Sequence, residues 1–171
     1  IILGGVMKGE AADLALDAIP LQMEALIDVG TDYAARGSWQ VEVVLPGARP
    51  RLGRFTVSDA SLVTSGTWVP SSVDGEGHFK QVVDARTGSL ADGAAVAVVA
   101  HPRGVIADAL STTLRVTGSD TSAVDVLGGW GVVFDADGAS SEVGRRGAIV
   151  KGWSVELLPE PKTPAVEEPP A

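Results

Sequence analysis

The fold is decided by residues 94–114, which have the sequence AAVAVVAHPRGVIADALSTTL. The stretch begins with a continuous run of small apolar residues, which is typical of a strand buried on both faces of a sheet. Directly after it, Ile106, Leu110 and Leu114 recur at helical spacing and predict an amphipathic helix. This part of the chain therefore combines a buried strand with a helix that has one apolar face.

The rest of the chain alternates between helical and strand periodicity. Residues 8–19 predict a helix that follows a double glycine and ends before Pro20. A short helix is expected at residues 122–127. The predicted strands are residues 25–29, 39–45, 54–57, 80–83, 132–134, 148–150 and 153–158. We therefore predict an α+β domain over residues 1–158, with a mixed, mostly antiparallel sheet and packed helices.

Composition limits the classes of function. The chain of 171 residues is 45% hydrophobic, which suits one domain with a sizeable core. A formal net charge of -9 argues against nucleic-acid or anionic-membrane partners, and no segment is long and apolar enough to span a bilayer. There is no cysteine and there are only two histidines, so a bound metal should have oxygen ligands, as Mg²⁺ does. Residues 159–171 are rich in Pro and Glu and predict a disordered tail.

Asp108 and Thr112 are a candidate cation site. They lie four residues apart and so share one face of the predicted helix, opposite its apolar stripe. Their oxygen atoms suit a hard divalent cation. The alternative is an ordinary solvated helix face, and the spacing by itself favours that alternative.

Three further segments could carry chemistry, and each has a structural alternative. Residues 3–9 place glycines and Lys8 before a helix, a pattern that suits phosphate oxygens but lacks the spacing of a Walker loop. Without further support, it is a glycine turn. Residues 64–66, Thr-Ser-Gly, predict a small polar turn of structural kind. Residues 84–88 could bind a ligand, although a turn closed by an ion pair between Asp84 and Arg86 is the favoured interpretation.

Five segments match a family pattern in their order along the chain. They are residues 3–13 (LGGVMKGEAAD), 30–32 (GTD), 64–66 (TSG), 81–88 (QVVDARTG) and 107–112 (ADALST). In this order they resemble the FAD:protein FMN transferases, the ApbE-like proteins once called thiamine-biosynthesis lipoproteins. The resemblance runs from residue 1 to about residue 135.

The resemblance implies an enzyme, a Mg²⁺-dependent transferase that uses FAD as its substrate. A threonine hydroxyl of an acceptor protein attacks the FMN phosphorus, and AMP departs. Family members hold the cation with groups that map to Asp108, Thr112 and the backbone carbonyl of Met7, and Asp108 is also a catalytic-site position. The remaining implied contacts to the dinucleotide are Lys8, Asp13, Asp32, Thr64, Ser65, Arg86 and Thr87.

Departures from the pattern leave two other hypotheses open. The family has a catalytic-site histidine where this chain has Gln81, and glutamine cannot act as a general base. His78 is a candidate replacement, with a surface loop residue as its structural alternative. The chain could therefore be a degenerate relative that binds or hydrolyses FAD, or a non-catalytic interaction domain. Because the chain opens within the first motif, we also expect an upstream half of the same polypeptide as a partner.

Overall fold

The structure is a computed structural model that describes residues 6–44, 51–66, 82–136, 139–144 and 155–156. Its helices are α1 (Met7–Asp17), α2 (Gly104–Thr117) and α3 (Ser122–Leu127). Its strands are β1 (Ala25–Asp28), β2 (Asp32–Arg36), β3 (Ser38–Val44), β4 (Arg51–Ser58), β5 (Ser61–Gly66), β6 (Val96–His101), β7 (Trp130–Phe134), β8 (Ser140–Gly144) and β9 (Val155–Glu156).

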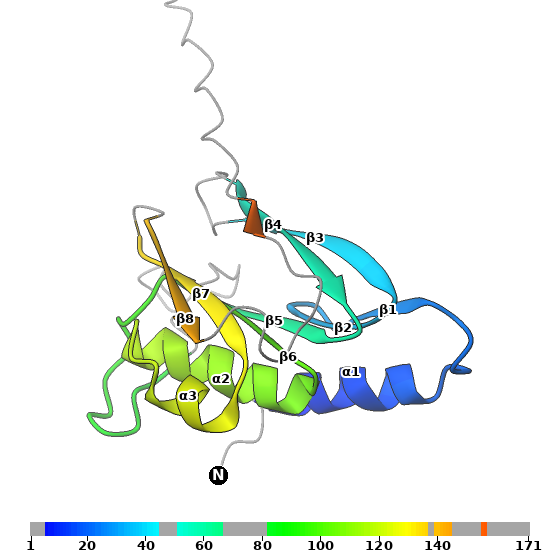
Figure 1. Cartoon of the computed structure of the whole chain (residues 1–171). Helices are drawn as coiled ribbons and strands as arrows, with labels where there is room; N and C mark the ends of the chain where they lie inside the picture. Colours follow the sequence, from blue (N-terminus) through cyan, green and yellow to red (C-terminus); the bar gives the residue numbers. More distant parts are fainter. Residues whose placement is uncertain (1–5, 45–50, 67–81, 137–138, 145–154, 157–171) are drawn as a thin grey trace, which may run out of the picture.

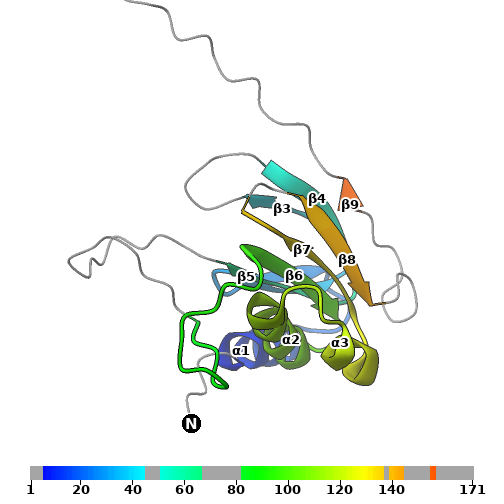
Figure 2. The same ribbon diagram turned by 90° about the vertical axis from the view of Figure 1, so that its left-hand side faces the viewer.

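Two sheets and a layer of helices make up the described part of the molecule. The larger sheet has six strands in the order β1-β2-β5-β6-β7-β8, and the smaller sheet has the order β3-β4-β9. Every neighbouring pair is antiparallel. The helices lie on one face of the larger sheet and the smaller sheet on the other (Figures 1 and 2). The α+β class predicted from the sequence is confirmed.

Strand β6 lies at the centre of the core and is buried on both faces. Val96, Val98 and Ala100 belong to the cluster between the two sheets, which also contains a contact between Phe55 and Trp130. Ala97 and Val99, which alternate with them, belong to the cluster beneath α2. All six residues of β6 are buried, which explains why the sequence of this strand is apolar without alternation.

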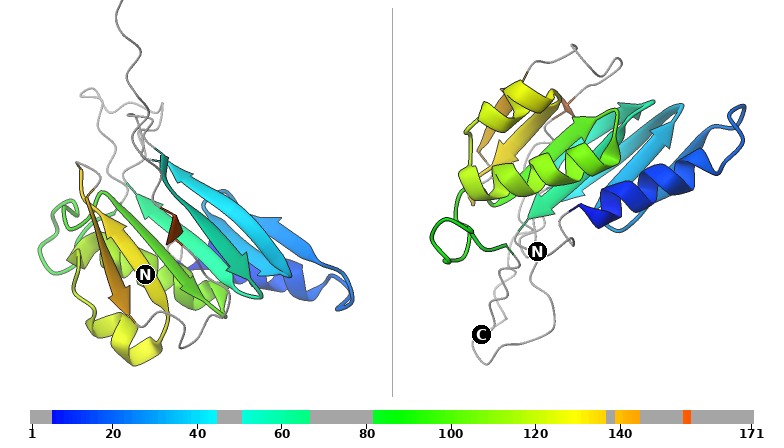
Figure 3. Two further views of the ribbon diagram at one scale, coloured as in Figure 1. Left: turned by 45° about the horizontal axis from the view of Figure 1, so that its top comes forward. Right: turned by 90° about the horizontal axis from the view of Figure 1, so that it is seen from below.

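Helix α1 lies beside the first turn of α2 and covers β1 and β2, while α2 covers β5 and β6 (Figure 3, right). The C-terminal end of α1 is stabilised by Arg36 of β2. The guanidinium donates hydrogen bonds to the carbonyl oxygens of Leu16 at 2.9 Å, Ile19 at 3.0 Å and Pro20 at 3.1 Å. The carbonyls of Leu16 and Pro20 each also accept one backbone amide, and the guanidinium adds a donor at the negative end of α1, where a cation is favourable.

Several predicted elements differ from the structure. Residues 64–66 belong to strand β5 rather than to a turn, because they pair with β6 in the middle of the larger sheet. Val83 forms only an isolated bridge with Leu90, and residues 80–81 lie outside the described part. Residues 148–150 and the tail at 159–171 also lie outside it, and the strand predicted at 153–158 is described only as β9.

None of the helices in the described segments is long and apolar enough for a transmembrane span.

Candidate functional site

The candidate site lies where α1 and α2 cross, near the N-terminal end of each helix. Gly9 of α1 lies against Gly104 of α2. A Cβ atom on Gly9 would be 2.2 Å from the carbonyl oxygen of Gly104, and one on Gly104 would be 2.6 Å from the carbonyl oxygen of Gly9. Both distances are far below van der Waals contact, so this approach requires glycine at both positions. The crossing brings the first turns of α1 onto the face of α2 that carries Asp108.

Asp108 is buried in this crossing, with 2% of its surface exposed. Its Oδ2 atom accepts a hydrogen bond from the backbone amide of Gly9 at 3.1 Å. The alternative of a solvated helix face is wrong for Asp108, because α1 packs on the side of α2 that is opposite the apolar stripe. Burial, together with the nearby Asp32 carboxylate, raises the pKa of Asp108 to about 6, although the Gly9 amide acts in the opposite direction.

Asp32 adds a second buried carboxylate to the site. It is 0% exposed, and its Oδ1 atom forms an ion pair with the ammonium group of Lys8. The Lys8 ammonium also donates to Thr31 Oγ1 at 2.5 Å, and the Thr31 hydroxyl donates to Asp32 Oδ1 at 2.8 Å. The other oxygen, Oδ2, has no hydrogen-bond partner among the described residues. Two carboxylates with one ammonium group leave the site with an excess of negative charge.

Hydroxyl groups line the adjoining part of the site. Ser65 of β5 lies with its Oγ atom 2.8 Å from Ser111 Oγ and 3.5 Å from Thr112 Oγ1. Ser111 in turn donates to the backbone carbonyl of Asp108 at 3.0 Å. The amide of Thr64 donates to the carbonyl of Thr31 at 2.9 Å. Strand β5 thus connects the Thr31–Asp32 corner to the helix face that carries Asp108 and Thr112.

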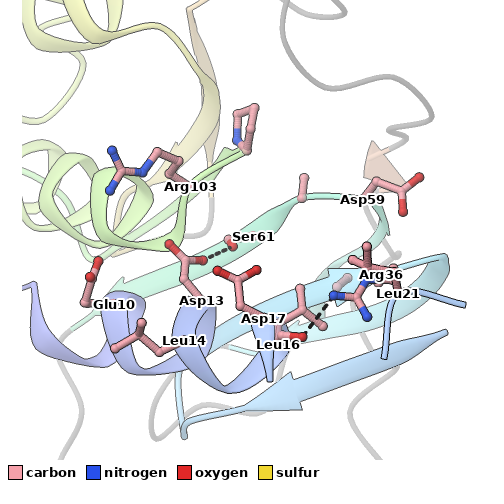
Figure 4. A pocket seen from close by; sticks show the side chains of 13 residues that line it. Glu10, Asp13, Leu14, Leu16, Asp17, Leu21, Arg36, Asp59, Ser61 and Arg103 are labelled. Carbon is pink, nitrogen blue, oxygen red and sulfur yellow. Dashed lines mark hydrogen bonds between the residues drawn. The ribbon is translucent and has the colours of Figure 1, made fainter. Parts of the chain in front are cut away.

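Asp13 lies at the same crossing, but its carboxylate contacts the beginning of α2 and Ser61. It also lines an open cleft of about 470 Å³ between α1, β2 and the loop before α2. Figure 4 shows Asp13 between the two helices, with Ser61 at hydrogen-bond distance and Arg103 on the other side of the cleft. The cleft is lined by negative carboxylates and positive guanidinium groups. Among them, Asp17 lies on its α1 side and Arg36 on its β2 side.

Arg86 and Thr87 lie in an exposed turn away from this cluster. The Arg86 guanidinium pairs with Asp84 at 2.8 Å, which confirms the predicted ion-paired turn, and the pair holds the pKa of Asp84 below its usual value. Hydrogen bonds from Ser122, with a smaller contribution from Arg86, lower the pKa of Asp120, which lies beyond the C-terminal end of α2. Asp108 is near the other end of that helix, nine residues before its last residue, or roughly 13 Å along the axis.

Gln81 lies outside the described residues, as does His78. Met7 is the first residue of α1 and its residue surface is 59% exposed. It lies two residues before Gly9, whose amide contacts Asp108, and a carbonyl oxygen has a second lone pair beyond its helical hydrogen bond. The backbone of Met7 therefore begins the same short segment that reaches Asp108.

The donors at the crossing fit a hard divalent cation. Asp108, the unpartnered Oδ2 of Asp32 and the hydroxyl of Thr112 are all oxygen donors, which Mg²⁺ prefers. A cation would also offset the excess negative charge. No group of three or more His, Cys, Asp or Glu residues with metal-binding geometry occurs in the described segments. A cation here would need hydroxyl and carbonyl ligands beside its carboxylates.

Sequence reasoning missed Thr31, Ser61, Gly104 and Ser111. Thr31 and Ser111 bond to groups of the site, and Ser61 and Gly104 bond to Asp13. All four are small polar residues or glycine, and their roles depend on contacts between elements far apart in the sequence. One signal was present, since Gly104 precedes Asp108 by the same four residues that separate Gly9 from Asp13.

The sequence pattern of the ApbE family matches residues 1–126, which is most of the chain. The chain belongs to the ApbE family. Its fold is similar to the crystal structure of the ApbE protein from Thermotoga maritima, with a TM-score of 0.70 and 24% sequence identity. That match covers 84% of this ApbE-family chain and 51% of the Thermotoga protein.

Two further structures with this fold are described as flavin transferases. The flavin transferase ApbE from Vibrio cholerae matches with a TM-score of 0.66 and 18% identity, over 85% of this chain and 50% of its own. The flavinyl transferase ApbE from Pseudomonas stutzeri, in its apo form, matches with a TM-score of 0.61 and 19% identity, over 81% and 47%. The chain thus spans about half the length of these solved relatives. No curated protein sequence matches it.

Proposed function

We propose that this chain forms the cation-binding part of a Mg²⁺-dependent FAD:protein FMN transferase. The whole enzyme would attach FMN to a threonine of an acceptor protein and release AMP. Family membership and the flavin transferases among its structural relatives support this class of reaction. The observation that carries the proposal is the buried pair of carboxylates, Asp32 and Asp108, together with the hydroxyl of Thr112, which lies one helical turn after Asp108.

In the proposed reaction, the threonine oxygen forms a bond to the FMN phosphorus. The bond from this phosphorus to the oxygen of the AMP phosphate breaks, AMP leaves with the electron pair, and the proton of the threonine hydroxyl is released to solvent. Asp108, Thr112 and the carbonyl of Met7 would hold the Mg²⁺ ion. When bound there, the ion would neutralise charge on the diphosphate and stabilise the departing AMP.

Lys8 suits the role of a phosphate contact. Its side chain is 43% exposed, so the ammonium group can reach a ligand while Asp32 and Thr31 hold it in place. Ser65 would form the wall beside it, because its Oγ atom lies 2.8 Å from Ser111 Oγ. Thr64 would contribute through its backbone, whose amide donates to the Thr31 carbonyl. Arg86 and Thr87 would contact the dinucleotide through their separate turn.

A second candidate function follows from Gln81. The acceptor threonine must lose its proton when its oxygen bonds to phosphorus, and a neutral amide side chain cannot take that proton. The chain would then be a degenerate relative that binds FAD with Mg²⁺, or hydrolyses it, without labelling an acceptor. A non-catalytic interaction domain is the third candidate, and it would bind no FAD.

One experiment separates these functions. The full-length protein that contains this chain is mixed with FAD, MgCl₂ and an acceptor domain with a target threonine. Mass spectrometry then measures the FMN adduct, and chromatography measures AMP. We expect both products, and we expect Asp108→Asn to abolish both. Asp17→Asn serves as a matched control, because it removes an exposed carboxylate from α1.

The other outcomes have distinct meanings. AMP without adduct identifies an FAD hydrolase, and Gln81→His should then produce the adduct if the missing base is the reason. Calorimetry that detects no binding of FAD in the presence of Mg²⁺ would identify the interaction domain. Full activity of Asp108→Asn would refute the assignment of the cation site.

A further inference from the structure

The first turns of α1 and α2 contain the same short pattern. Residues 9–13 are Gly-Glu-Ala-Ala-Asp and residues 104–108 are Gly-Val-Ile-Ala-Asp, so both have the form Gly-x-x-Ala-Asp. The alanines at the fourth position of each pattern, Ala12 and Ala107, are 1% and 0% exposed. A glycine and a buried alanine on one helix face allow two helix backbones to approach closely.

The two patterns bind each other reciprocally. The amide of Gly9 donates to Asp108 Oδ2 at 3.1 Å. The amide of Gly104 donates to Asp13, at 2.8 Å from Oδ1 and 2.7 Å from Oδ2. Each aspartate thus accepts a hydrogen bond from the glycine of the other helix. We call this arrangement, formed by Gly9, Asp13, Gly104 and Asp108, the helix clasp.

The two aspartates of the helix clasp differ in how many donors they have. Asp13 also accepts from the amide of Val105 at 3.4 Å and from the hydroxyl of Ser61 at 3.1 Å. Its carboxylate is therefore surrounded by donors at the positive end of α2, which satisfies amides that have no partner within the helix. Asp108 accepts one amide through Oδ2 and lies beside another carboxylate. Both oxygens of Asp13 thus accept hydrogen bonds, whereas Asp108 has an oxygen available for a ligand.

We propose that Asp13 is a positioning residue, which fixes the N-terminal turn of α2 and thereby sets where Asp108 and Thr112 present their oxygens. Asp13 then acts on the cation through α2 instead of contacting the dinucleotide itself. This inference rests on the proposed function for its cation, although the helix clasp can be tested without one. The physical basis is that Gly104 begins the same helix on which Asp108 lies one turn later.

The test uses Asp13→Asn in the full-length protein. The asparagine keeps the size of the side chain but replaces one acceptor oxygen with an NH₂ group that faces the Gly104 amide. Calorimetry with MgCl₂, with and without FAD, should show an affinity about tenfold to a hundredfold weaker than that of the wild type, as for other residues that orient metal ligands. Asp108→Asn should remove binding, and Asp17→Asn should leave it unchanged. Asp13→Glu should recover part of the affinity.

Several outcomes would overturn the inference. Unchanged Mg²⁺ affinity in folded Asp13→Asn would show that Asp13 contributes only stability. Complete loss, equal to that of Asp108→Asn, would show that Asp13 is itself a ligand. If Asp13→Asn does not fold, Ser61→Ala replaces it and should weaken Mg²⁺ binding a few-fold; no change would refute the role.

Amide hydrogen exchange tests the helix clasp independently of the cation. Asp13→Asn should speed exchange at Gly104, which it contacts, and also at Gly9, whose bond is to Asp108. Faster exchange at Gly104 alone would refute the coupling. If the wild type binds no Mg²⁺, the proposed function fails, while the exchange at Gly9 still decides whether Asp13 positions Asp108.

Discussion

Replacing Asp108 with Asn should stabilise the metal-free protein near neutral pH while removing the proposed cation ligand. The folded protein raises the pKa of Asp108 from 3.8 to about 6, so ionisation of this carboxyl disfavours the folded state. The difference of about two pKa units corresponds to about 3 kcal/mol. Asparagine has no such charge. Its oxygen can still accept the Gly9 amide, and its NH₂ group can donate to the unpartnered Oδ2 of Asp32.

The pH dependence follows from the direction of this shift. Below about pH 4 the carboxyl is protonated in both states, so Asp108→Asn and the wild type should differ little. Between about pH 4 and pH 6 the unfolded wild type ionises first, and its folded state loses stability as the pH rises. Above about pH 6 the loss is complete, so the advantage of the variant reaches its maximum there.

Thermal unfolding in EDTA, followed by circular dichroism from pH 4 to pH 8, measures this difference. For a chain of this length, about 3 kcal/mol corresponds to a rise of about 6–12 °C in Tm. Asp17→Asn is the control for the loss of one negative charge on an exposed surface, and it should change Tm little. A variant that is less stable than the wild type at pH 8, or an advantage that does not depend on pH, would refute the reasoning.

Two other substitutions test the packing and charge of the site. Gly9→Ala should destabilise the protein by about 1–3 kcal/mol in urea unfolding, because its Cβ would lie 2.2 Å from the Gly104 carbonyl oxygen. The control is Ala11→Ser, on the exposed side of α1. Equal losses of stability in the two variants would argue against the close crossing. Lys8→Ala should lower the free energy of unfolding by about 1–3 kcal/mol, because it leaves the buried Asp32 without its ammonium partner. Adding Asp32→Asn to the same protein should recover most of that loss. Additive effects in this double-mutant cycle would contradict the ion pair.

The sequence predicted the framework of the fold from local patterns. The run of small apolar residues in β6 predicted burial on both faces, and helical spacing predicted α1 to within a few residues at its ends and placed α2 directly after β6. β2, β5 and β8 were missed. In β2 and β5 the reason is that Asp32, Thr64, Ser65 and Gly66 resemble turn residues. In the structure the side chains of Asp32 and Ser65 contact groups of the site, so these polar residues stand where a strand pattern would have apolar ones.

The burial of Asp108 could not be predicted from its own helix. Periodicity distinguishes the apolar stripe of α2 from the opposite face, but it does not show what packs on that opposite face. Here the partner is Gly9, which is 99 residues away along the chain. The resemblance brought the two segments together as parts of one site, and the structure supplied the physical reason, which is a helix crossing that only glycine allows.

The helix clasp also shows how one local pattern can give a structural and a functional carboxylate. Asp13 and Asp108 occupy equivalent positions, and both accept an amide from the opposite helix. The difference lies in the remaining neighbours. Asp13 accepts further hydrogen bonds from Val105 and Ser61, whereas Asp108 is buried and faces the Asp32 carboxylate, and both of these features oppose its ionisation.

A bound cation would reverse that opposition. It would stabilise the ionised form of Asp108, supply a partner for Asp32 Oδ2 and offset the second negative charge. The stability lost on ionisation and the affinity for a cation therefore both depend on the negative charge of Asp108. If Mg²⁺ raises the Tm of the wild type at pH 8 and leaves that of Asp108→Asn unchanged, the destabilised carboxylate is the ligand.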